Sequence, residues 1–399
     1  MAPASPPARA AATAGPAPAT RPRNRRQLIV GAAGRVFSER GYHATSMEEV
    51  AARVGITAAA LYRHFPNKYA LFAACADVMV DGLVTALDEV PPGAALTDVL
   101  TALTRITVAH RASGGVYRWE ARYLSREDRR RLGAKFARLV ERVDEAVQRE
   151  HPLPDERLRA MAALGAIGSI TMHHTSIAQR RAEDLLLASA LGVAASDPAA
   201  GRLSTPVVVR LPAQPVPRTR RAEILAASIP LFARDGFVSV TNGQIAEAVG
   251  LTPSALYRHY PGKIDILAAA CLQAAGLLAQ GVEQNLREVT GPHDAIVVLA
   301  ATYVAYSFEY TELNSVAEAE LAGLPAGLRR PVVLAQRDHI AVWEQQLRQA
   351  RPELDPRQAR VLVHAGFGVA VEAGRRLRWR DTPGHRETVT ALVVGALGL

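Results

Sequence analysis

The chain has 399 residues, long enough for two or more domains that each bury a core of their own. Hydrophobic residues make up 49% and aromatic residues only 5%, and the prevalence of Ala, Leu and Val favours helices over strands. The two cysteines, Cys75 and Cys271, are too few for a disulfide framework and lack the spacing of a zinc site. We therefore expect an all-α protein of the reducing cytoplasm, with no metal and no cofactor.

The net charge of +9 is unevenly distributed along the chain. Residues 21–70 hold nine Arg and Lys against three Asp and Glu, and residues 218–263 hold six against three. In the rest of the chain the basic and acidic residues cancel. All of the excess positive charge therefore lies in two short segments, as expected of two surfaces that contact phosphates.

The N-terminal residues 1–20 consist almost entirely of Ala, Pro, Ser, Thr and Gly, and we expect a disordered tail there. This segment lacks the apolar core of a signal peptide. No run of about 18 uncharged apolar residues predicts a membrane-spanning helix elsewhere. We expect a soluble protein with no membrane partner.

An internal repeat organises the chain. Residues 41–68, GYHATSMEEVAARVGITAAALYRHFPNK, align without a gap with residues 236–263, GFVSVTNGQIAEAVGLTPSALYRHYPGK, and 12 of the 28 positions are identical. So long a period indicates duplicated domains. After the tail we expect helix-turn-helix domain 1 at 21–75, helical body 1 at 76–192, a linker at 193–217, helix-turn-helix domain 2 at 218–271 and helical body 2 at 272–399.

The same local signals recur in both repeats. A glycine suits the end of a first helix, a Ser or Thr caps a second helix, a glycine permits a tight turn, and a Thr caps a third helix. This order predicts a helix-turn-helix. The residues are Gly41, Ser46, Gly55 and Thr57 in the first repeat and Gly236, Thr241, Gly250 and Thr252 in the second.

The segments TSMEEVAARVGITAAALYRHFPNK and VTNGQIAEAVGLTPSALYRHYPGK resemble the DNA-binding signature of the TetR family, over about 50 residues in each half. The resemblance implies a double-stranded DNA operator as partner. It implies phosphate contacts from Tyr62, His64, Lys68, Tyr257, His259 and Lys263, and from Thr45, whose counterpart Val240 cannot donate. It implies that base edges face Ala58, Ala59, Ala60, Pro253, Ser254 and Ala255. We add to the expected interface Ser46, Glu48, Thr57, Arg63, Thr241, Gln244, Thr252 and Arg258.

One such Tyr-Arg-His run would ordinarily be a solvated helix face, but two copies inside two charge excesses favour DNA binding. The basic arms at 21–26 and 218–221 are expected to add phosphate or minor-groove contacts, or else to be solvated chain ends. The two reading surfaces differ, because Ser254 can hydrogen-bond a base edge and alanine cannot. We therefore expect an asymmetric operator.

TetR-like proteins pair through the last two helices of each unit, and we expect this bundle to form within the chain. The candidate helices are 155–177, 182–192, 355–379 and 385–398. If they pack together, one chain is a pseudo-dimer; the alternative is core packing within separate halves. Further dimerisation stays open.

The resemblance also implies a cavity for a small effector in each body. The candidate lining residues are Trp119, Tyr123 and His173 in the first half and Tyr306, Phe308 and His364 in the second, with ordinary core packing as the alternative for each. A mainly apolar interior suits a lipid-like effector. Adjacent His173 and His174 would point to different helix faces, which disfavours a shared metal.

The resulting hypothesis is a sequence-specific transcriptional repressor that a small effector releases from its operator. An architectural DNA-binding protein without a sensor is the alternative, and activation in place of repression stays open. A helical enzyme is disfavoured because the sequence has no Gly-rich phosphate loop, GxSxG elbow or HExxH pair.

Overall fold

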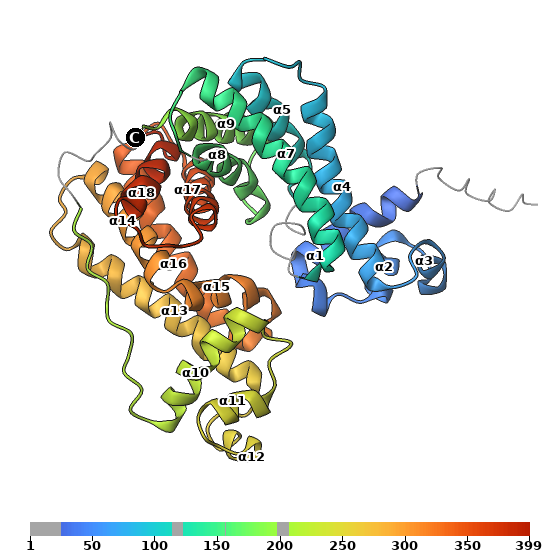
Figure 1. Cartoon of the computed structure of the whole chain (residues 1–399), viewed down its shortest axis with the longest axis vertical. Helices are drawn as coiled ribbons and strands as arrows, with labels where there is room; N and C mark the ends of the chain where they lie inside the picture. The colour runs from blue at the N-terminus through green and yellow to red at the C-terminus, as the bar shows by residue number, and fades with distance from the viewer. Residues whose placement is uncertain (1–24, 114–122, 156, 198–206) are drawn as a thin grey trace, which may run out of the picture.

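The computed structural model describes residues 25–113, 123–155, 157–197 and 207–399, and within these ranges every regular element is helical (Figure 1). The all-α prediction is therefore confirmed for the described part of the chain. Trp119, one of the residues expected to line an effector cavity, lies outside the described residues.

The helices fall into two sets that follow the same order. The first set is α1 (Arg25–Ala44), α2 (Met47–Val54), α3 (Ala58–His64), α4 (Lys68–Asp88), α5 (Leu96–Ala109), α7 (Arg126–Glu150), α8 (Leu158–Gly168), η2 (Ser169–Thr171) and α9 (Gln179–Ala195). The second set is α10 (Arg220–Asp235), α11 (Asn242–Ala248), α12 (Pro253–Leu256), α13 (Lys263–Leu286), α14 (Pro292–Glu309), α15 (Thr311–Glu320), η3 (Leu321–Gly323), α16 (Ala326–Ala350), α17 (Pro356–Arg376) and α18 (His385–Ala396).

Each set begins with a small domain, which we call head 1 (α1 to α3 with the start of α4) and head 2 (α10 to α12 with the start of α13). The heads lie apart, at the right and at the bottom of Figure 1. Their cores use matching positions, because apolar residues of head 1 recur 195 positions later in head 2. The pairs are Ile29 and Ile224, Phe37 and Phe232, Val50 and Ile245, Leu61 and Leu256, and Phe72 and Leu267.

The long helices α4 and α13 connect each head to its body. Both are long and apolar enough to cross a membrane by length and composition alone, which the sequence prediction did not anticipate. In the fold they are packed helices: α4 contacts α1, α5 and α7, and α13 contacts α14, α15 and α16. Asp77 of α4 forms an ion pair with Arg131 of α7, as expected of a helix with one face in a protein core and one in water.

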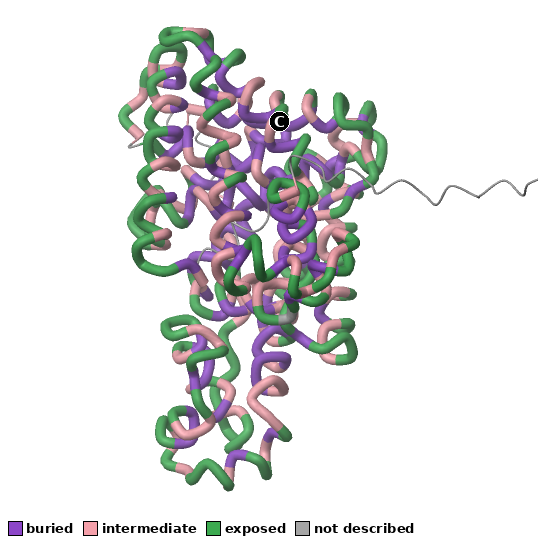
Figure 2. The backbone as a smooth tube through the Cα atoms, turned by 90° about the vertical axis from the view of Figure 1, so that its right-hand side faces the viewer, coloured by how far each residue is buried: buried purple, intermediate pink, exposed green. Residues whose placement is uncertain are grey.

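The two bodies share one core, which holds buried residues of α5, α7, α8 and α9 from the first half and of α14, α16, α17 and α18 from the second. Figure 2 shows the buried segments gathered in the upper part of the molecule, above head 2. The helices α8, α9, α17 and α18 pack against one another in a four-helix bundle. The expected pseudo-dimer within one chain is therefore confirmed.

Glycines set how closely this bundle packs. A Cβ atom on Gly165 of α8 would lie 2.5 Å from the carbonyl oxygen of Gly368 of α17, and one on Gly368 would lie 2.3 Å from that of Gly165. Gly192 of α9 meets Gly395 of α18 in the same way, at 2.4 Å. In both pairs the partners stand 203 positions apart. This constant spacing indicates that each glycine of the first body faces the equivalent glycine of the second body. Contact between equivalent residues is the geometry of a two-fold axis.

The first-half bundle helix is shorter than expected. Helix was predicted over 155–177, but α8 ends at Gly168 and is followed by the short η2. The hydroxyls of Ser169 and Thr171 donate to the carbonyls of Ala166 and Gly168, at 2.7 and 2.8 Å. Such local bonds compete with the helical pattern. The second-half helix α17, predicted over 355–379, has no such break.

One contact joins head 1 to the other half of the chain. The helix α1 lies against η3, the short helix that continues α15 of the second body. Head 1 is therefore held by its own body and also touches the body of head 2.

The glycine crossing gives the first testable prediction. Gly368→Ala places a methyl group against the Gly165 carbonyl, so α8 and α17 must separate, and we expect a loss of about 2 kcal/mol or more in the free energy of unfolding. Gly133→Ala is the control, because nothing lies within 4 Å of its added Cβ in α7, and a helix-interior alanine should add about 0.5–1 kcal/mol. Urea unfolding of both variants measures the difference; equal stabilities would contradict the close crossing.

Candidate nucleic-acid interface

Side-chain caps build both helix-turn-helix units. In head 1, Ser46 Oγ accepts from the Glu49 N–H at 3.1 Å and Thr57 Oγ1 accepts from the Ala60 N–H at 3.2 Å. In head 2, Thr241 and Thr252 cap α11 and α12 through the N–H groups of Gln244 and Ala255, at 3.2 and 3.3 Å. The four predicted caps are confirmed.

The turns between the two helices need glycine. Gly55 and Gly250 have φ angles of 69° and 66°, in the left-handed region that favours this residue. The predicted tight turns are therefore confirmed in both heads.

The third helix of each head divides into a buried and an exposed side. Leu61 and Leu256 are buried, whereas Tyr62 and Tyr257 are 46% and 55% exposed. Exposed side chains around these tyrosines form what we call reading surface 1 and reading surface 2. They are Glu48, Ala59, Arg63 and His64 in head 1 and Pro253, Ser254 and Arg258 in head 2.

Other residues that were expected to contact DNA are partly buried or form hydrogen bonds within the head. Ala58, Ala60, Ala255 and His259 are half-buried. Gln244 is exposed, but its amide oxygen accepts from the N–H of Thr241 at 2.8 Å and closes a capping box. In head 2 the Asn242 amide donates to the Tyr257 hydroxyl at 2.8 Å, so this tyrosine is held by α11.

The structure gives Lys68 and Lys263 internal partners. The ammonium of Lys68 donates to the carbonyls of Tyr42, His43 and Thr45, at 3.0, 3.3 and 3.1 Å. Lys263 donates to the three equivalent carbonyls of head 2. Burial lowers the pKa of both lysines. With three donors and three acceptors each ammonium is fully used, so we infer that these lysines hold the turn before the second helix. The phosphate contacts expected of them stay predictions.

Thr45 is also internal. It is 2% exposed, and its hydroxyl donates to the Gly41 carbonyl at 2.9 Å. Its counterpart Val240 is fully buried. The position therefore contributes to the packing of the head in both halves, with a polar residue in one and an apolar residue in the other.

The basic arms show a repeated contact that the sequence reasoning missed. Arg26 lies over the ring of Phe65 at 4.7 Å, and Arg221 lies over the ring of Tyr260 at 3.9 Å. Both residues of one pair stand 195 positions before those of the other, so the alignment, carried past Gly41 toward the N-terminus, would have found them. Each guanidinium is fixed beside the end of the third helix.

The third helices differ between the heads. The helix α3 spans seven residues, whereas α12 spans the four residues Pro253–Leu256. The predicted helix around Tyr257 continues only as turns, in which Arg258 and His259 donate to carbonyls three positions earlier, at 3.2 and 3.0 Å. This tighter bonding changes the path of the segment that carries reading surface 2.

The expected effector-lining residues are dispersed in the fold. Tyr123 stacks on Tyr42 of head 1, with ring centroids 5.4 Å apart. Tyr306 is buried and donates to the Ala274 carbonyl at 3.1 Å, and Phe308 packs edge-on against Trp379 at 5.3 Å. These side chains take part in core packing, the alternative that the sequence left open for each.

His173 and His364 meet across the bundle, with stacked rings whose centroids are 4.0 Å apart. His364 also packs against Phe367, which joins a cluster of aromatic rings from α14, α16 and α17: Tyr303, His339 and Trp343. Burial, with a contribution from His364, lowers the pKa of His173 to about 2, and burial lowers the pKa of His364 to about 4. Both rings are therefore neutral at pH 7. Among the described residues no group of three or more His, Cys, Asp or Glu side chains could hold a metal.

Comparisons with known proteins agree with this geometry. The family model described as "Bacterial regulatory proteins, tetR family" matches residues 29–75 and 224–270, one segment in each head. The HTH-type transcriptional activator FasR of Mycolicibacterium smegmatis is 43% identical over 69 residues, 17% of this chain and 31% of FasR. The nucleoid occlusion factor SlmA of Photorhabdus laumondii is 29% identical over 148 residues, 35% of this chain and 71% of SlmA.

Among solved structures, a TetR-family transcriptional regulator from Bordetella parapertussis aligns with a TM-score of 0.42 and 21% identity, over 45% of this chain and 95% of that one. The match to FasR spans about a third of that relative's length.

Two capped helix-turn-helix heads on a shared helical body define a tandem helix-turn-helix protein. Two segments of the chain match the family model of the tetR regulatory proteins, so the chain carries a TetR-type N-terminal head twice. A family of regulatory proteins also agrees with the expectation that the chain is not an enzyme.

The lysine contacts give the second prediction. Lys68→Met removes three charge-assisted hydrogen bonds, and we expect head 1 to lose about 2 kcal/mol of stability. Arg63→Met is the control, because Arg63 is exposed on reading surface 1 and its loss should leave stability unchanged. Thermal unfolding of both variants provides the measurement. A Lys68→Met protein as stable as the wild type would contradict this structural role of Lys68.

The buried histidines give the third prediction. Their folded-state pKa values lie below the usual value of about 6.5, so the unfolded chain binds more protons, and stability falls as the pH drops from about 6.5 toward 4. Each histidine should cost about 1 kcal/mol between pH 7 and pH 5.5.

His364→Phe keeps a stacked ring without a titrating group, and its stability should fall less steeply with acid than that of the wild type. The exposed His293 provides the control His293→Gln. Urea unfolding between pH 5 and pH 7.5 tests this, and parallel curves for wild type and His364→Phe would show that the histidine pair has no such role.

Proposed function

We propose that the chain is a sequence-specific DNA-binding regulator of transcription whose two heads engage one duplex. The observation that carries the proposal is a capped third helix in each head, with a Tyr-Arg-His run at or just after its end whose Tyr and Arg are exposed. An exposed tyrosine hydroxyl and a guanidinium at the end of such a helix are suited to phosphate oxygens. The excess of positive charge in the two segments that form the heads supports the same reading.

We further propose that the operator is asymmetric. At the start of the third helix, head 1 has Ala58 and Ala59 where head 2 has Pro253 and Ser254. Alanine makes only apolar contact with a thymine methyl, whereas a serine hydroxyl bonds a base edge. The exposed Glu48, whose counterpart is Gly243, is a second difference. Two unlike surfaces do not require a palindrome.

Repression by blocking the promoter, with release by a small effector, completes the proposal, and we place the protein in the cytoplasm. The cytoplasmic setting is supported by two free and buried cysteines, Cys75 and Cys271. The finer expectation of a lipid-like effector stays a prediction. Tyr306, Phe308 and His364, which were expected to line its cavity, make packing contacts.

Substitution of the two exposed tyrosines gives the fourth prediction. Tyr62→Ala and Tyr257→Ala each remove a proposed contact to the duplex, so each should weaken binding to the operator at least tenfold. Tyr62→Ala should leave stability unchanged, and Tyr257→Ala should lose only the exposed hydrogen bond with Asn242. Leu334→Ala is the matched control, because Leu334 is an exposed apolar residue of the body, 47% exposed. A footprint on the DNA upstream of the protein's own gene locates the operator. Electrophoretic mobility shifts with this DNA, titrated with salt, measure the affinities.

Two outcomes would count against the proposal. If no sequence-selective shift is found at any ionic strength, the proposal that the protein regulates transcription by binding DNA is wrong. Indifference to either tyrosine would mean that only one head reads the duplex. Transcription from the same promoter in vitro distinguishes repression from activation.

A further inference from the structure

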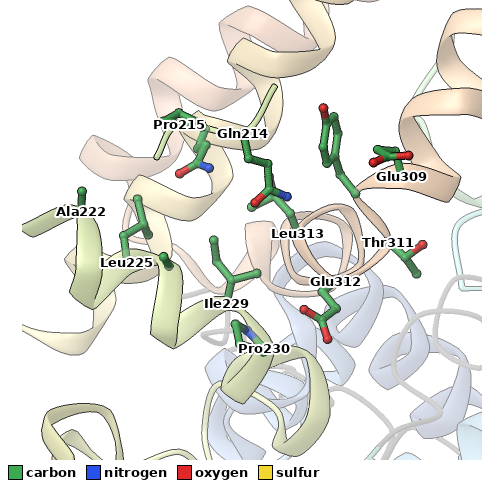
Figure 3. A pocket seen from close by; sticks show the side chains of 13 residues that line it. Gln214, Pro215, Ala222, Leu225, Ile229, Pro230, Glu309, Thr311, Glu312 and Leu313 are labelled. Atoms are coloured by element: carbon green, nitrogen blue, oxygen red, sulfur yellow. The ribbon is translucent and has the colours of Figure 1, made fainter. Parts of the chain in front are cut away.

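A pocket of about 320 Å³ lies where the linker, α10 of head 2 and the junction of α14 with α15 meet (Figure 3). Figure 3 shows Leu225 and Ile229 on α10, Leu313 of α15 across from Ile229, and Glu309 and Glu312 above and below Leu313. The pocket is at the small end of the range for ligand sites, about 300–1,000 Å³. It is separate from the aromatic cluster around His364.

The linker forms a fixed wall of this pocket. Asn285 of α13 accepts from the backbone N–H of Arg210 and donates to its carbonyl, each at 3.0 Å. The Tyr310 hydroxyl donates to the carbonyl of Pro212. Gln214 and Pro215, which follow directly, line the pocket. The wall is therefore tied to the second body just before it reaches the cavity.

The floor is apolar and the rim is acidic. Leu225, Ile229 and Leu313 provide the apolar surface, and Glu309 and Glu312 provide two carboxyl groups. None of the described lining residues is Lys, Arg or His, in a protein with a net charge of +9. Glu309 pairs with Arg386 at 3.1 Å, so Glu312 carries the less compensated charge. Opposite charge in a cleft attracts and concentrates a cationic ligand.

The helix α10 adds a backbone acceptor to the same pocket. Pro230 lies inside α10 and has no N–H to donate to the carbonyl four residues earlier, that of Ala226. Ala226 and Pro230 both line the pocket. Glu309, Glu312 and Tyr310 line it as well, so carboxyl groups and an aromatic ring belong to the same pocket as the carbonyl that Pro230 leaves without its usual donor.

We propose that this pocket is an effector site for a small amphipathic organic cation, an ammonium compound with at least one N–H and a compact apolar group. The apolar group lies on Leu225, Ile229 and Leu313, and the ammonium binds at Glu312 and the Ala226 carbonyl. This inference rests on the proposed function and deepens it, since it names a small cation as the effector class in place of the lipid-like class expected from the sequence.

The position of the pocket connects it to both heads. One wall is α10, the first helix of head 2. Another wall is the start of α15, and α15 continues into η3, which lies against α1 of head 1. A ligand that shifts α15 relative to α10 therefore acts on the second head directly and on the first through η3. An effector that favours one arrangement of α15 relative to α10 changes the spacing of the two reading surfaces.

Binding is tested first, by isothermal titration calorimetry on the full chain at pH 7.5. The probes are phenethylamine, its N,N,N-trimethyl derivative, which has no ammonium N–H, and the anion 3-phenylpropanoate. We expect phenethylamine to bind at least tenfold more tightly than the anion and more tightly than the trimethyl derivative. Equal binding of the three probes, or no binding at millimolar concentration, overturns the assignment of the ligand class.

Variants locate the site. Glu312→Gln should weaken phenethylamine binding about tenfold, whereas Glu288→Gln, at an exposed glutamate just beyond α13, should not change it. Pro230→Ala restores an N–H in α10 for the Ala226 carbonyl and should reduce the preference for phenethylamine over the trimethyl derivative. Undiminished binding to Glu312→Gln places the ligand elsewhere and overturns the site.

Coupling is tested by repeating the mobility shifts with saturating phenethylamine. We expect at least a threefold change in operator affinity for the wild type and none for Glu312→Gln. Ligand binding without any change in operator affinity overturns the effector role. If the chain binds no DNA even without ligand, the proposed function fails, while the calorimetry still decides whether the pocket is a ligand site.

Discussion

The crossing of α8 and α17 is the contact on which the rest of the molecule depends. Because Gly165 and Gly368 have no side chains, the two backbones touch, and apolar residues of both halves close over the crossing into one core. The second glycine pair, Gly192 and Gly395, lets α9 and α18 approach as closely. The separation of the heads follows from this bundle, since α4 and α13 run from the bodies into the heads.

The two halves have kept some contacts and lost others. Lys68 and Lys263 hold equivalent carbonyls, and Arg26 and Arg221 cover equivalent rings. These contacts maintain the shape of each head. The surfaces that would face DNA and the bodies behind them differ more: α12 is shorter than α3, and α17 extends past the point where α8 stops. The two repeats thus agree in the contacts that shape each head and differ in the surfaces that would determine DNA specificity.

Much of the head was predictable because its signals are local. Caps such as Ser46 and Thr57 act on N–H groups three residues away, and Gly55 determines its own turn. The role of Lys68 was not predictable in this way, because its acceptors lie 23 to 26 positions earlier and meet it only in the fold. The pocket beside Glu312 could not be predicted for the same reason, since its walls come from the linker and four separate helices.

Joining both partners of the bundle in one polypeptide has a consequence for how the molecule assembles. In a homodimer, association costs translational freedom and dilution favours dissociation. Here the glycine pairs meet within a single chain, so the bundle forms in a first-order step and survives at copy numbers of a few molecules per cell. Because Gly165 and Gly368 are separate positions of one chain, a substitution at Gly165 leaves Gly368 unchanged. The two halves of the bundle can therefore diverge independently.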